Sequence, residues 1–339
     1  MIIDSEFKPA WWMSNAHAQT IFSSMRHPIQ ATVDKVEKME LPDGDFLDLA
    51  WSTANLPDSS PLIVILHGLG GCVNSSYVAR FMKVFNQNGW RVVLMHFRGA
   101  GKELNRLPRA YHSGDTGDLD FLISVLAQRE PESKKAVVGV SLGGNVLLKW
   151  LGEQGSQSKV STAVAISVPF LLNKVANKMN LGFSRLYQAR LLMQLKDVFA
   201  RKTSQLKNPP DAIKKAATCN CFWTFDDQVT APLYGFNSAH TYYRESSSRK
   251  YLKAITTPTL IIHSLDDPFM TTDVLPTEDE LSDVVTLELS KKGGHVGFIA
   301  GNTPGVPVYW LDQRIPEFLS EQLNNKTNES LLSPHHELT

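Results

Sequence analysis

Cysteine is scarce in this sequence, with three among 339 residues: Cys72, Cys219 and Cys221. An odd and low count argues against a disulfide framework and is typical of proteins from a reducing compartment. Cys219 and Cys221 are one residue apart, and neither a second cysteine pair nor a nearby histidine completes a zinc site. The sequence therefore predicts no metal and favours a cytoplasmic protein.

Long apolar runs are also lacking, since no stretch approaches the roughly 18 residues that a membrane-spanning helix needs. Residues 1–14 have no basic start followed by an apolar stretch, so they do not resemble a secretory signal peptide. We therefore expect a soluble protein without stable insertion into a membrane.

Neither sign of charge is in excess, because 34 Lys and Arg residues match 34 Asp and Glu residues. No overall basic field attracts nucleic acid, so no nucleic-acid partner is expected. The charge is uneven, however, because residues 174–215 hold ten basic and two acidic residues, a net charge of +8. A solvated helix face is the simpler interpretation of this segment, and weak peripheral contact with an anionic membrane is the alternative. The composition leaves the oligomeric state open.

Short apolar runs rich in β-branched residues alternate with helical patterns along most of the chain. Six runs have the character of strands buried on both faces: 62–66, 92–97, 136–140, 163–168, 259–262 and 284–289. Helical patterns cover 76–86, 115–128, 142–151 and 308–323. This alternation predicts an α/β fold with a mostly parallel central sheet flanked by helices. Two earlier runs, 33–41 and 46–51, meet at a Pro-Asp-Gly-Asp turn and predict a hairpin at one edge.

The alternation fails over residues 170–251, where the pattern becomes helical and polar. One helix there carries two stripes, apolar Tyr187, Leu191, Leu195 and Val198 opposite polar Arg190, Gln194, Asp197 and Arg201. We expect a helical cap over the carboxyl edge of the sheet, inserted into a core of residues 31–169 and 252–323. Residues 1–30 are expected to form an N-terminal arm, and the polar residues 324–339 a disordered tail.

A G-x-S-x-G motif, Gly139-Val140-Ser141-Leu142-Gly143, joins a predicted strand to a predicted helix. The turn between them is too tight for large flanking side chains, which explains the glycines, and it lifts the Ser141 hydroxyl above the sheet. It also aims the first helix amides, that of Leu142 above all, at a reacting carbonyl. This context is that of the nucleophile in the α/β-hydrolase fold, so Ser141 is predicted to be a nucleophile rather than a helix cap.

A second glycine-rich turn, His67-Gly68-Leu69-Gly70-Gly71, follows the strand at 62–66. In α/β-hydrolases a loop at this place supplies the second amide of the oxyanion hole, here that of Leu69. The loop is not a dinucleotide fingerprint, because Val73 stands where the third glycine belongs. It also lacks the Gly-Lys-Ser/Thr of a phosphate loop, so no cofactor is expected.

The predicted base is His295, in the turn Gly293-Gly294-His295 after the last strand. A base in this fold reaches the nucleophile from a loop at that place, and the chain order is serine, acid, histidine. His67, His96 and His263 end other predicted strands and are interpreted as structural.

The predicted acid lies in Asp266-Asp267-Pro268, after the strand at 259–262. Its position after the strand does not choose between the two aspartates, but neighbouring side chains of an extended segment point in opposite directions, so only one can face His295. Pro268 favours an extended Asp267. Asp226 and Asp227 lie inside the insertion and are weaker candidates.

Together these segments resemble the YheT-like esterases, the AB hydrolase 4 family of the α/β-hydrolase superfamily. The resemblance covers nearly the whole chain and includes Asn15-Ala16-His17-Ala18-Gln19-Thr20, Phe97-Arg98-Gly99-Ala100-Gly101, Tyr111-His112-Ser113-Gly114-Asp115-Thr116, Tyr242-Tyr243-Arg244, Asp266-Asp267-Pro268-Phe269 and Gly293-Gly294-His295-Val296-Gly297-Phe298. It implies the triad Ser141, Asp267 and His295. It also implies carboxylesterase activity on short- or medium-chain acyl esters, and a role in lipid metabolism for some relatives. We interpret the segment 15–20 as an arm docked on the domain.

We therefore expect a serine hydrolase that cleaves small-molecule carboxylic esters through an acyl-enzyme and without a cofactor. An acyltransferase that uses the same triad with an alcohol in place of water is the alternative. A non-catalytic binding module with this fold is less expected, because the triad is complete.

Overall fold

The computed structural model describes residues 1–24 and 30–323, and nine strands of this part of the chain form one sheet. The strands lie in the order β1-β9-β8-β7-β6-β4-β5-β3-β2. Their bounds are β1 (Ile2–Asp4), β2 (Lys35–Glu40), β3 (Phe46–Ser52), β4 (Leu62–Leu66), β5 (Arg91–Met95), β6 (Lys135–Val140), β7 (Thr162–Ile166), β8 (Thr259–Ser264) and β9 (Val285–Ser290). β3 pairs antiparallel with β2 and with β5, and the other neighbours pair in parallel. The predicted parallel sheet and its edge hairpin are confirmed.

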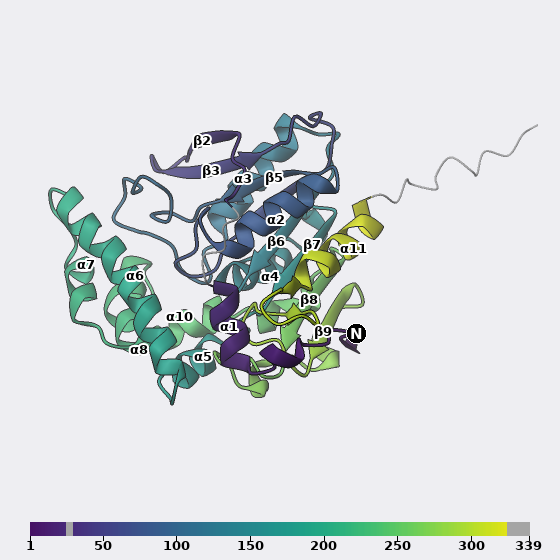
Figure 1. Ribbon diagram of the computed structural model, residues 1–339. Coiled ribbons are helices and arrows are strands. Elements are labelled where there is room, and N and C mark those ends of the chain that lie inside the picture. The colour runs from purple at the N-terminus through teal and green to yellow at the C-terminus, as the bar shows by residue number, and fades with distance from the viewer. Residues whose placement is uncertain (25–29, 324–339) are drawn as a thin grey trace, which may run out of the picture.

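Helices cover both faces of this sheet (Figure 1). On one face lie α2 (Ser76–Gln87) and α11 (Leu311–Leu323), and on the other α3 (Gly117–Arg129) and α4 (Leu142–Gln154). Every residue of β4 is apolar because both faces of the strand are buried. Leu62 and Val64 pack on the α3 and α4 side, whereas Ile63 and Ile65 pack on the α2 and α11 side.

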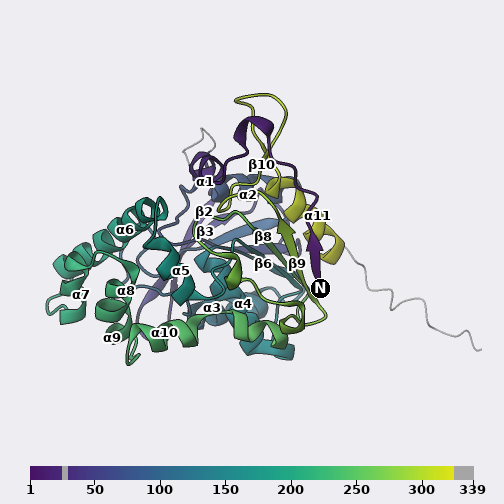
Figure 2. The same ribbon diagram turned by 90° about the horizontal axis from the view of Figure 1, so that it is seen from below.

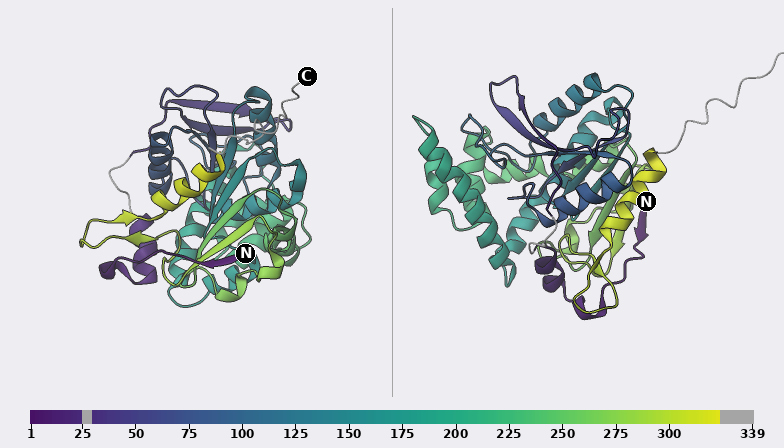
Figure 3. Two further views of the ribbon diagram at one scale, coloured as in Figure 1. Left: turned by 90° about the vertical axis from the view of Figure 1, so that its right-hand side faces the viewer. Right: turned by 45° about the horizontal axis from the view of Figure 1, so that its top comes forward.

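The structure adds three strands that the sequence patterns did not predict. β1 runs parallel to β9 at the far edge of the sheet, so the N-terminus lies beside the C-terminal half of the chain (Figure 3). β10 (Ile299–Ala300) and β11 (Val308–Tyr309) form a small antiparallel pair. The helix predicted from residue 308 is therefore wrong at its start, because α11 begins at Leu311. Strands of two or three residues are too short to show an alternating pattern.

Between β7 and β8 the chain is helical, and these helices gather on one side of the molecule (Figure 2). They are α5 (Leu172–Met179), α6 (Ser184–Gln205), α7 (Asp211–Lys215), α8 (Phe222–Phe225), α9 (Ala231–Leu233) and α10 (Ala239–Ser246). We call α5 to α10 the cap. No helix within residues 1–24 and 30–323 combines the length and the apolarity needed to cross a bilayer. The predicted tail, 324–339, lies outside the described residues.

The buried stripe of α6 differs from the predicted one. Leu195 is buried as predicted, but the other buried residues include Gln188, Leu192 and Lys202, whereas Tyr187, Leu191 and Val198 are half-buried. Gln188 is buried because its side chain accepts from the Phe222 amide and donates to Asn180 within the cap. Because the prediction counted apolar residues alone, it placed the stripe too far round the helix.

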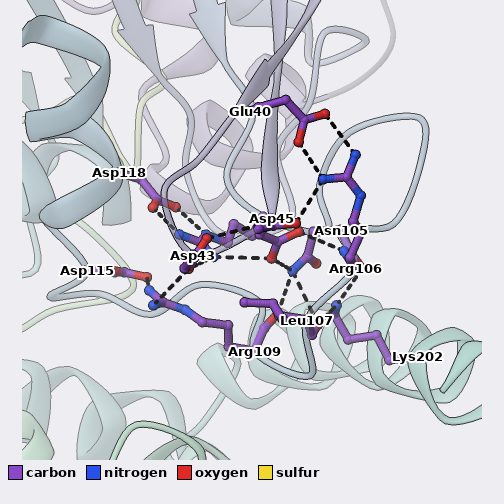
Figure 4. A network of polar contacts seen from close by, with 12 residues as sticks. Glu40, Asp43, Asp45, Asn105, Arg106, Leu107, Arg109, Asp115, Asp118 and Lys202 are labelled. Atoms are coloured by element: carbon purple, nitrogen blue, oxygen red, sulfur yellow. Dashed lines mark hydrogen bonds and ion pairs between the residues drawn. The ribbon is translucent and has the colours of Figure 1, made fainter. Parts of the chain in front are cut away.

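Lys202 ties the cap to the core (Figure 4). Its ammonium group donates to the carbonyls of Leu107 (2.7 Å) and Asn105 (3.2 Å), and burial lowers the pKa of Lys202 to about 8. The Asn105 side chain in turn donates to Asp45 (2.6 Å), which also pairs with Arg98 (3.2 Å). This network of buried polar groups anchors α6 to the loop after β5.

Candidate active site

Ser141 sits on a strained turn between β6 and α4. Its φ is 53° and its ψ is −116°, in a region that residues with side chains rarely adopt. The flanking glycines are required by close backbone contacts. A Cβ on Gly139 would lie 2.6 Å from the Gly143 carbonyl oxygen, and one on Gly143 would lie 2.4 Å from that of Leu66. The tight turn that the motif predicts is therefore present.

Among the three predicted triad residues, His295 lies within hydrogen-bonding distance of both Ser141 and Asp267. His295 Nε2 is 3.0 Å from Ser141 Oγ, and His295 Nδ1 is 2.8 Å from Asp267 Oδ2. A carboxylate accepts at Nδ1, which places the imidazole proton there and leaves the Nε2 lone pair facing the serine hydroxyl. Ser141, Asp267 and His295 lie in loops that follow three different parallel strands, β6, β8 and β9. The carboxyl ends of these strands share one edge of the sheet.

The neighbouring aspartate, Asp266, has a different partner. Its Oδ1 accepts from the amide of Gly294 at 2.9 Å, whereas Asp267 uses its second oxygen to accept from the Phe269 amide at 2.8 Å. Lys292 lies 3.9 Å from Asp266. Asp266 thus supports the backbone of the loop that carries His295, and Asp267 contacts the imidazole itself.

The two aspartates of the insertion lie in the cap. Asp226 begins a π-helical turn (Asp226–Thr230) and accepts from the Tyr243 hydroxyl and the Thr230 hydroxyl, both at 2.7 Å. Burial raises the pKa of Asp226 to about 6. Asp227 accepts from the amide of Ala239 at the start of α10. The contacts that hold these carboxylates belong to the architecture of the cap.

The Leu69 amide lies in a turn whose other amides already have acceptors. Gly68 donates to the Tyr77 hydroxyl and Gly70 to the Tyr111 hydroxyl, both at 2.9 Å, and Gly71 donates to the Gly68 carbonyl. Within residues 1–24 and 30–323, the Leu69 amide has no such acceptor. A Cβ on Gly68 would lie 3.4 Å from Ser141 Cβ, so this turn is beside the nucleophile.

Leu142 is the first residue of α4 and directly follows Ser141. Amides in the first turn of a helix have no carbonyl partner within the helix. Leu69 and Leu142 line the same cavity as Ser141 and His295. Two backbone amides near Ser141 are therefore available to an anionic oxygen.

Three other histidines are held in the core as neutral groups. His67 accepts from the Phe97 amide at 3.2 Å and donates to the Gly68 carbonyl at 2.7 Å, and burial lowers the pKa of His67 to about 3. Burial also lowers the pKa of His263 to about 4, and it lowers the pKa of His96. The burial of all three side chains fits the structural interpretation.

Two cavities meet at Ser141 and His295. The first, of about 110 Å³, runs under the cap, and apolar residues such as Val175, Ala176 and Leu195 line most of its wall. The second, of about 330 Å³, is more polar and lies between α1 (Ala16–Ser24), the loop 68–77 and α6. A bound molecule could therefore extend in two chemically different directions from the serine.

Three residues that contact the His295 loop were missed by the sequence reasoning. Thr20 Oγ1 accepts from the His295 amide at 2.8 Å, and Ser167 Oγ accepts from the Val296 amide at 3.1 Å. The Phe269 ring stacks on the imidazole with centroids 3.9 Å apart. Phe269 and Thr20 lie in segments that carried the resemblance, but their roles depend on tertiary contacts.

No metal site is apparent in the described part of the chain. Among residues 1–24 and 30–323, no three or more His, Cys, Asp or Glu side chains are grouped so that they could hold an ion.

The chain is similar to several known proteins. Residues 61–301 match the family described as alpha/beta hydrolase fold. The Escherichia coli (strain K12) protein named "Putative esterase YheT" is 40% identical over 95% of this chain and 95% of its own length. A Saccharomyces cerevisiae monoacylglycerol lipase is 32% identical over 72% of this chain and 56% of its own length. The solved structure of a Pyrococcus furiosus esterase superposes with a TM-score of 0.54 at 18% identity, covering 85% of this chain and 92% of that one.

Proposed function

Because the chain belongs to the α/β hydrolase family, we propose that it is a serine hydrolase of carboxylic esters with Ser141, His295 and Asp267 as its catalytic triad. The observation that supports this most strongly is the hydrogen-bonded series from Asp267 through His295 to Ser141. Its serine end opens onto a largely apolar cavity. This is the geometry of an activated serine nucleophile.

In the proposed acylation step, Ser141 Oγ attacks the ester carbonyl carbon while His295 Nε2 takes the hydroxyl proton. Asp267 stabilises the imidazolium that forms and holds the ring in the required tautomer. The amides of Leu69 and Leu142 donate to the oxyanion of the tetrahedral intermediate. The intermediate then collapses, and the alcohol leaves with the proton from His295.

Deacylation repeats these steps with water. His295 removes a proton from a water molecule, which attacks the acyl carbonyl, and the acid leaves as Ser141 Oγ regains its proton. No group other than the protein and water takes part. An acyltransferase would use an alcohol at this step, and the names of the relatives favour hydrolysis. Measuring acid and transesterified product with and without an added alcohol distinguishes the two.

We propose that the apolar cavity binds the acyl chain, because its wall suits hydrocarbon, and that the more polar cavity receives the alcohol. The kcat/KM for p-nitrophenyl esters is then expected to rise from acetate toward octanoate. Each buried methylene contributes about 0.8 kcal/mol, or about fourfold in rate. Wild-type protein that hydrolyses none of these esters would contradict the proposed function.

Ala176 on α5 allows a test of the cavity assignment. It is buried and lines the apolar cavity, so Ala176→Leu shortens the available space. We expect this variant to keep its activity on acetate and to lose about tenfold or more on octanoate. Ala200→Leu on the exposed face of α6 is the matched control. An unchanged chain-length preference in Ala176→Leu would place the acyl chain elsewhere.

We also propose weak peripheral contact between α6 and an anionic lipid surface. Exposed apolar side chains lie on and just before α6: Leu181, Phe183, Leu186 and Met193. Arg185 and Arg190 are exposed on the same helix, and Arg190 lines the polar cavity beside Ser141. Apolar side chains combined with basic ones are the usual basis of such contact.

Co-sedimentation with lipid vesicles tests this contact. We expect binding to vesicles with anionic lipid, little binding to neutral vesicles, and loss of binding in the double variant Leu186→Glu and Met193→Glu. The preference for anionic vesicles is expected because each basic side chain near an anionic surface contributes about 1 kcal/mol to binding. Val36→Glu, at an exposed position of the edge strand β2, is the control. Equal and negligible binding to both kinds of vesicle would contradict the proposal.

A reducing, cytoplasmic location is proposed on separate grounds. Cys72, Cys219 and Cys221 are all free thiols. Free thiols persist in reducing compartments, and secreted proteins more often carry disulfides.

A further inference from the structure

The loop that carries His295 has an unfavourable backbone. Val296 has a φ of 61° and Phe298 a φ of 46°, and Gly293 and Gly294 also have positive φ. A β-branched residue such as Val296 rarely adopts a left-handed conformation. Strained conformations of this kind persist where surrounding contacts hold them. The position of the imidazole therefore depends on what packs against this loop.

One of these contacts comes from the N-terminal helix α1. The Thr20 hydroxyl donates to the Ala16 carbonyl at 2.8 Å, one turn back in the helix. This bond turns the hydroxyl proton toward Ala16, so a lone pair of Thr20 Oγ1 accepts from the backbone amide of His295 at 2.8 Å. Thr20 thus fixes the backbone of the predicted base itself.

Gln19 holds the other end of the same loop. It is fully buried, its Oε1 accepts from the Ile299 amide at 2.6 Å, and its Nε2 donates to the Ile299 carbonyl at 3.0 Å. The side chain amide thereby pairs with the backbone as a neighbouring strand would. Nε2 also donates to the Met13 carbonyl at 2.7 Å, which fixes the orientation of the amide.

The helix and the loop are in direct backbone contact. A Cβ on Gly294 would lie 2.5 Å from the Ala16 carbonyl oxygen and 2.7 Å from Thr20 Oγ1. A Cβ on Gly297 would lie 2.8 Å from Gln19 Cβ. The glycines on either side of His295 therefore allow α1 to approach closely.

α1 is itself anchored at both ends. Asn15 Oδ1 accepts from the His17 amide, and His17 Nδ1 lies 3.1 Å from the Tyr187 hydroxyl of the cap helix α6. At the other end, the Ser23 carbonyl accepts from the hydroxyl of Ser76 on α2. The helix is therefore a fixed support, connected to both the cap and the core.

We propose that α1 is a positioning element of the active site, in which Thr20 and Gln19 hold the His295 loop so that the imidazole stays between Asp267 and Ser141. This inference rests on the proposed function. Thr20 and Gln19 are positioning residues, because their contacts are to the backbone of the loop. The positioning role of α1 also accounts for the segment 15–20, for which the sequence indicated only an arm docked on the domain.

Substitution of Thr20 tests this inference. Thr20→Val keeps the shape and removes the acceptor, so we expect kcat for p-nitrophenyl ester hydrolysis to fall about 10- to 100-fold, as small misplacements of catalytic groups do. KM should change little, because neither cavity loses volume. Thr20→Ser restores the hydroxyl and is expected to recover most of the wild-type kcat. Thr203→Val is the matched control, since Thr203 makes the same bond within a helix, to Phe199 at 2.8 Å.

Labelling with a fluorophosphonate separates a positioning role from a loss of folded protein. The final extent of labelling gives the fraction of protein with a functional active site, and the rate of labelling reports the reactivity of Ser141. We expect Thr20→Val to label to the same extent but more slowly. If that variant does not fold, Thr20→Ala is measured in the same way.

Normal kcat per labelled site in the folded variant, or equal losses in Thr20→Val and Thr20→Ser, would overturn the inference. A wild-type protein that neither labels nor hydrolyses esters would instead contradict the proposed function.

Discussion

Replacing Ser141 by alanine is expected to lower kcat for ester hydrolysis by roughly 10³-fold or more while the protein stays folded. The variant removes the nucleophilic oxygen, which lies within hydrogen-bonding distance of His295 Nε2. The strained backbone of the turn is retained, because it depends on the neighbouring glycines and not on the hydroxyl. The measurements are steady-state kinetics on the best p-nitrophenyl ester and a thermal unfolding curve.

Ser161→Ala is the control for this experiment, since Ser161 is exposed just before β7. It should retain wild-type kinetics and fluorophosphonate labelling, whereas Ser141→Ala should not be labelled. Retention of more than about a tenth of the wild-type kcat in Ser141→Ala would rule out Ser141 as the nucleophile.

Replacing Asp267 by asparagine is expected to lower kcat by about 10⁴-fold, as in other triads that lose their acid. The asparagine side chain can present its NH₂ group to His295 Nδ1, which would place the imidazole proton on Nε2. In that tautomer Nε2 cannot accept the proton of Ser141. The ring would remain stacked on Phe269, so the loss should appear in kcat with a folded protein.

Asp266→Asn is the matched comparison, one residue away. Its remaining carbonyl oxygen can still accept from the Gly294 amide, so we expect a loss below about tenfold. The two variants are compared by kcat and by thermal unfolding. If the ranking is reversed, Asp266 is the acid. If neither variant loses activity, the acid lies elsewhere, and Asp226 and Asp227 are the next to test.

Much of the fold was predictable because its signals are local. The run 62–66 is apolar at every position because β4 is buried on both faces, and the alternation of such runs with helices specifies a parallel sheet. The turn around Ser141 was predictable for the same reason, because its glycines are required by close contacts at a single strand-turn-helix unit.

Other features depend on side chains that are distant in the sequence. The buried stripe of α6 includes Gln188 and Lys202, which no count of apolar residues would place inside, because their hydrogen-bond partners lie on other segments. β1 is a strand because β9 provides its partner, and its three residues carry no pattern of their own.

The sequence by itself determined the order of the helices and strands, because periodicity is a property of neighbouring residues. It also determined which reactive residues and glycines stand in the turns after the strands. The tertiary structure decided what holds the loop of His295 in place, and it brings the carboxylate of Asp267, which the resemblance had implied, into contact with the imidazole. Asp266 and Asp267 are equivalent by position, and a difference in side-chain direction separates them. Thr20 is 275 residues from His295 along the chain, and folding alone brings its hydroxyl to the amide it holds.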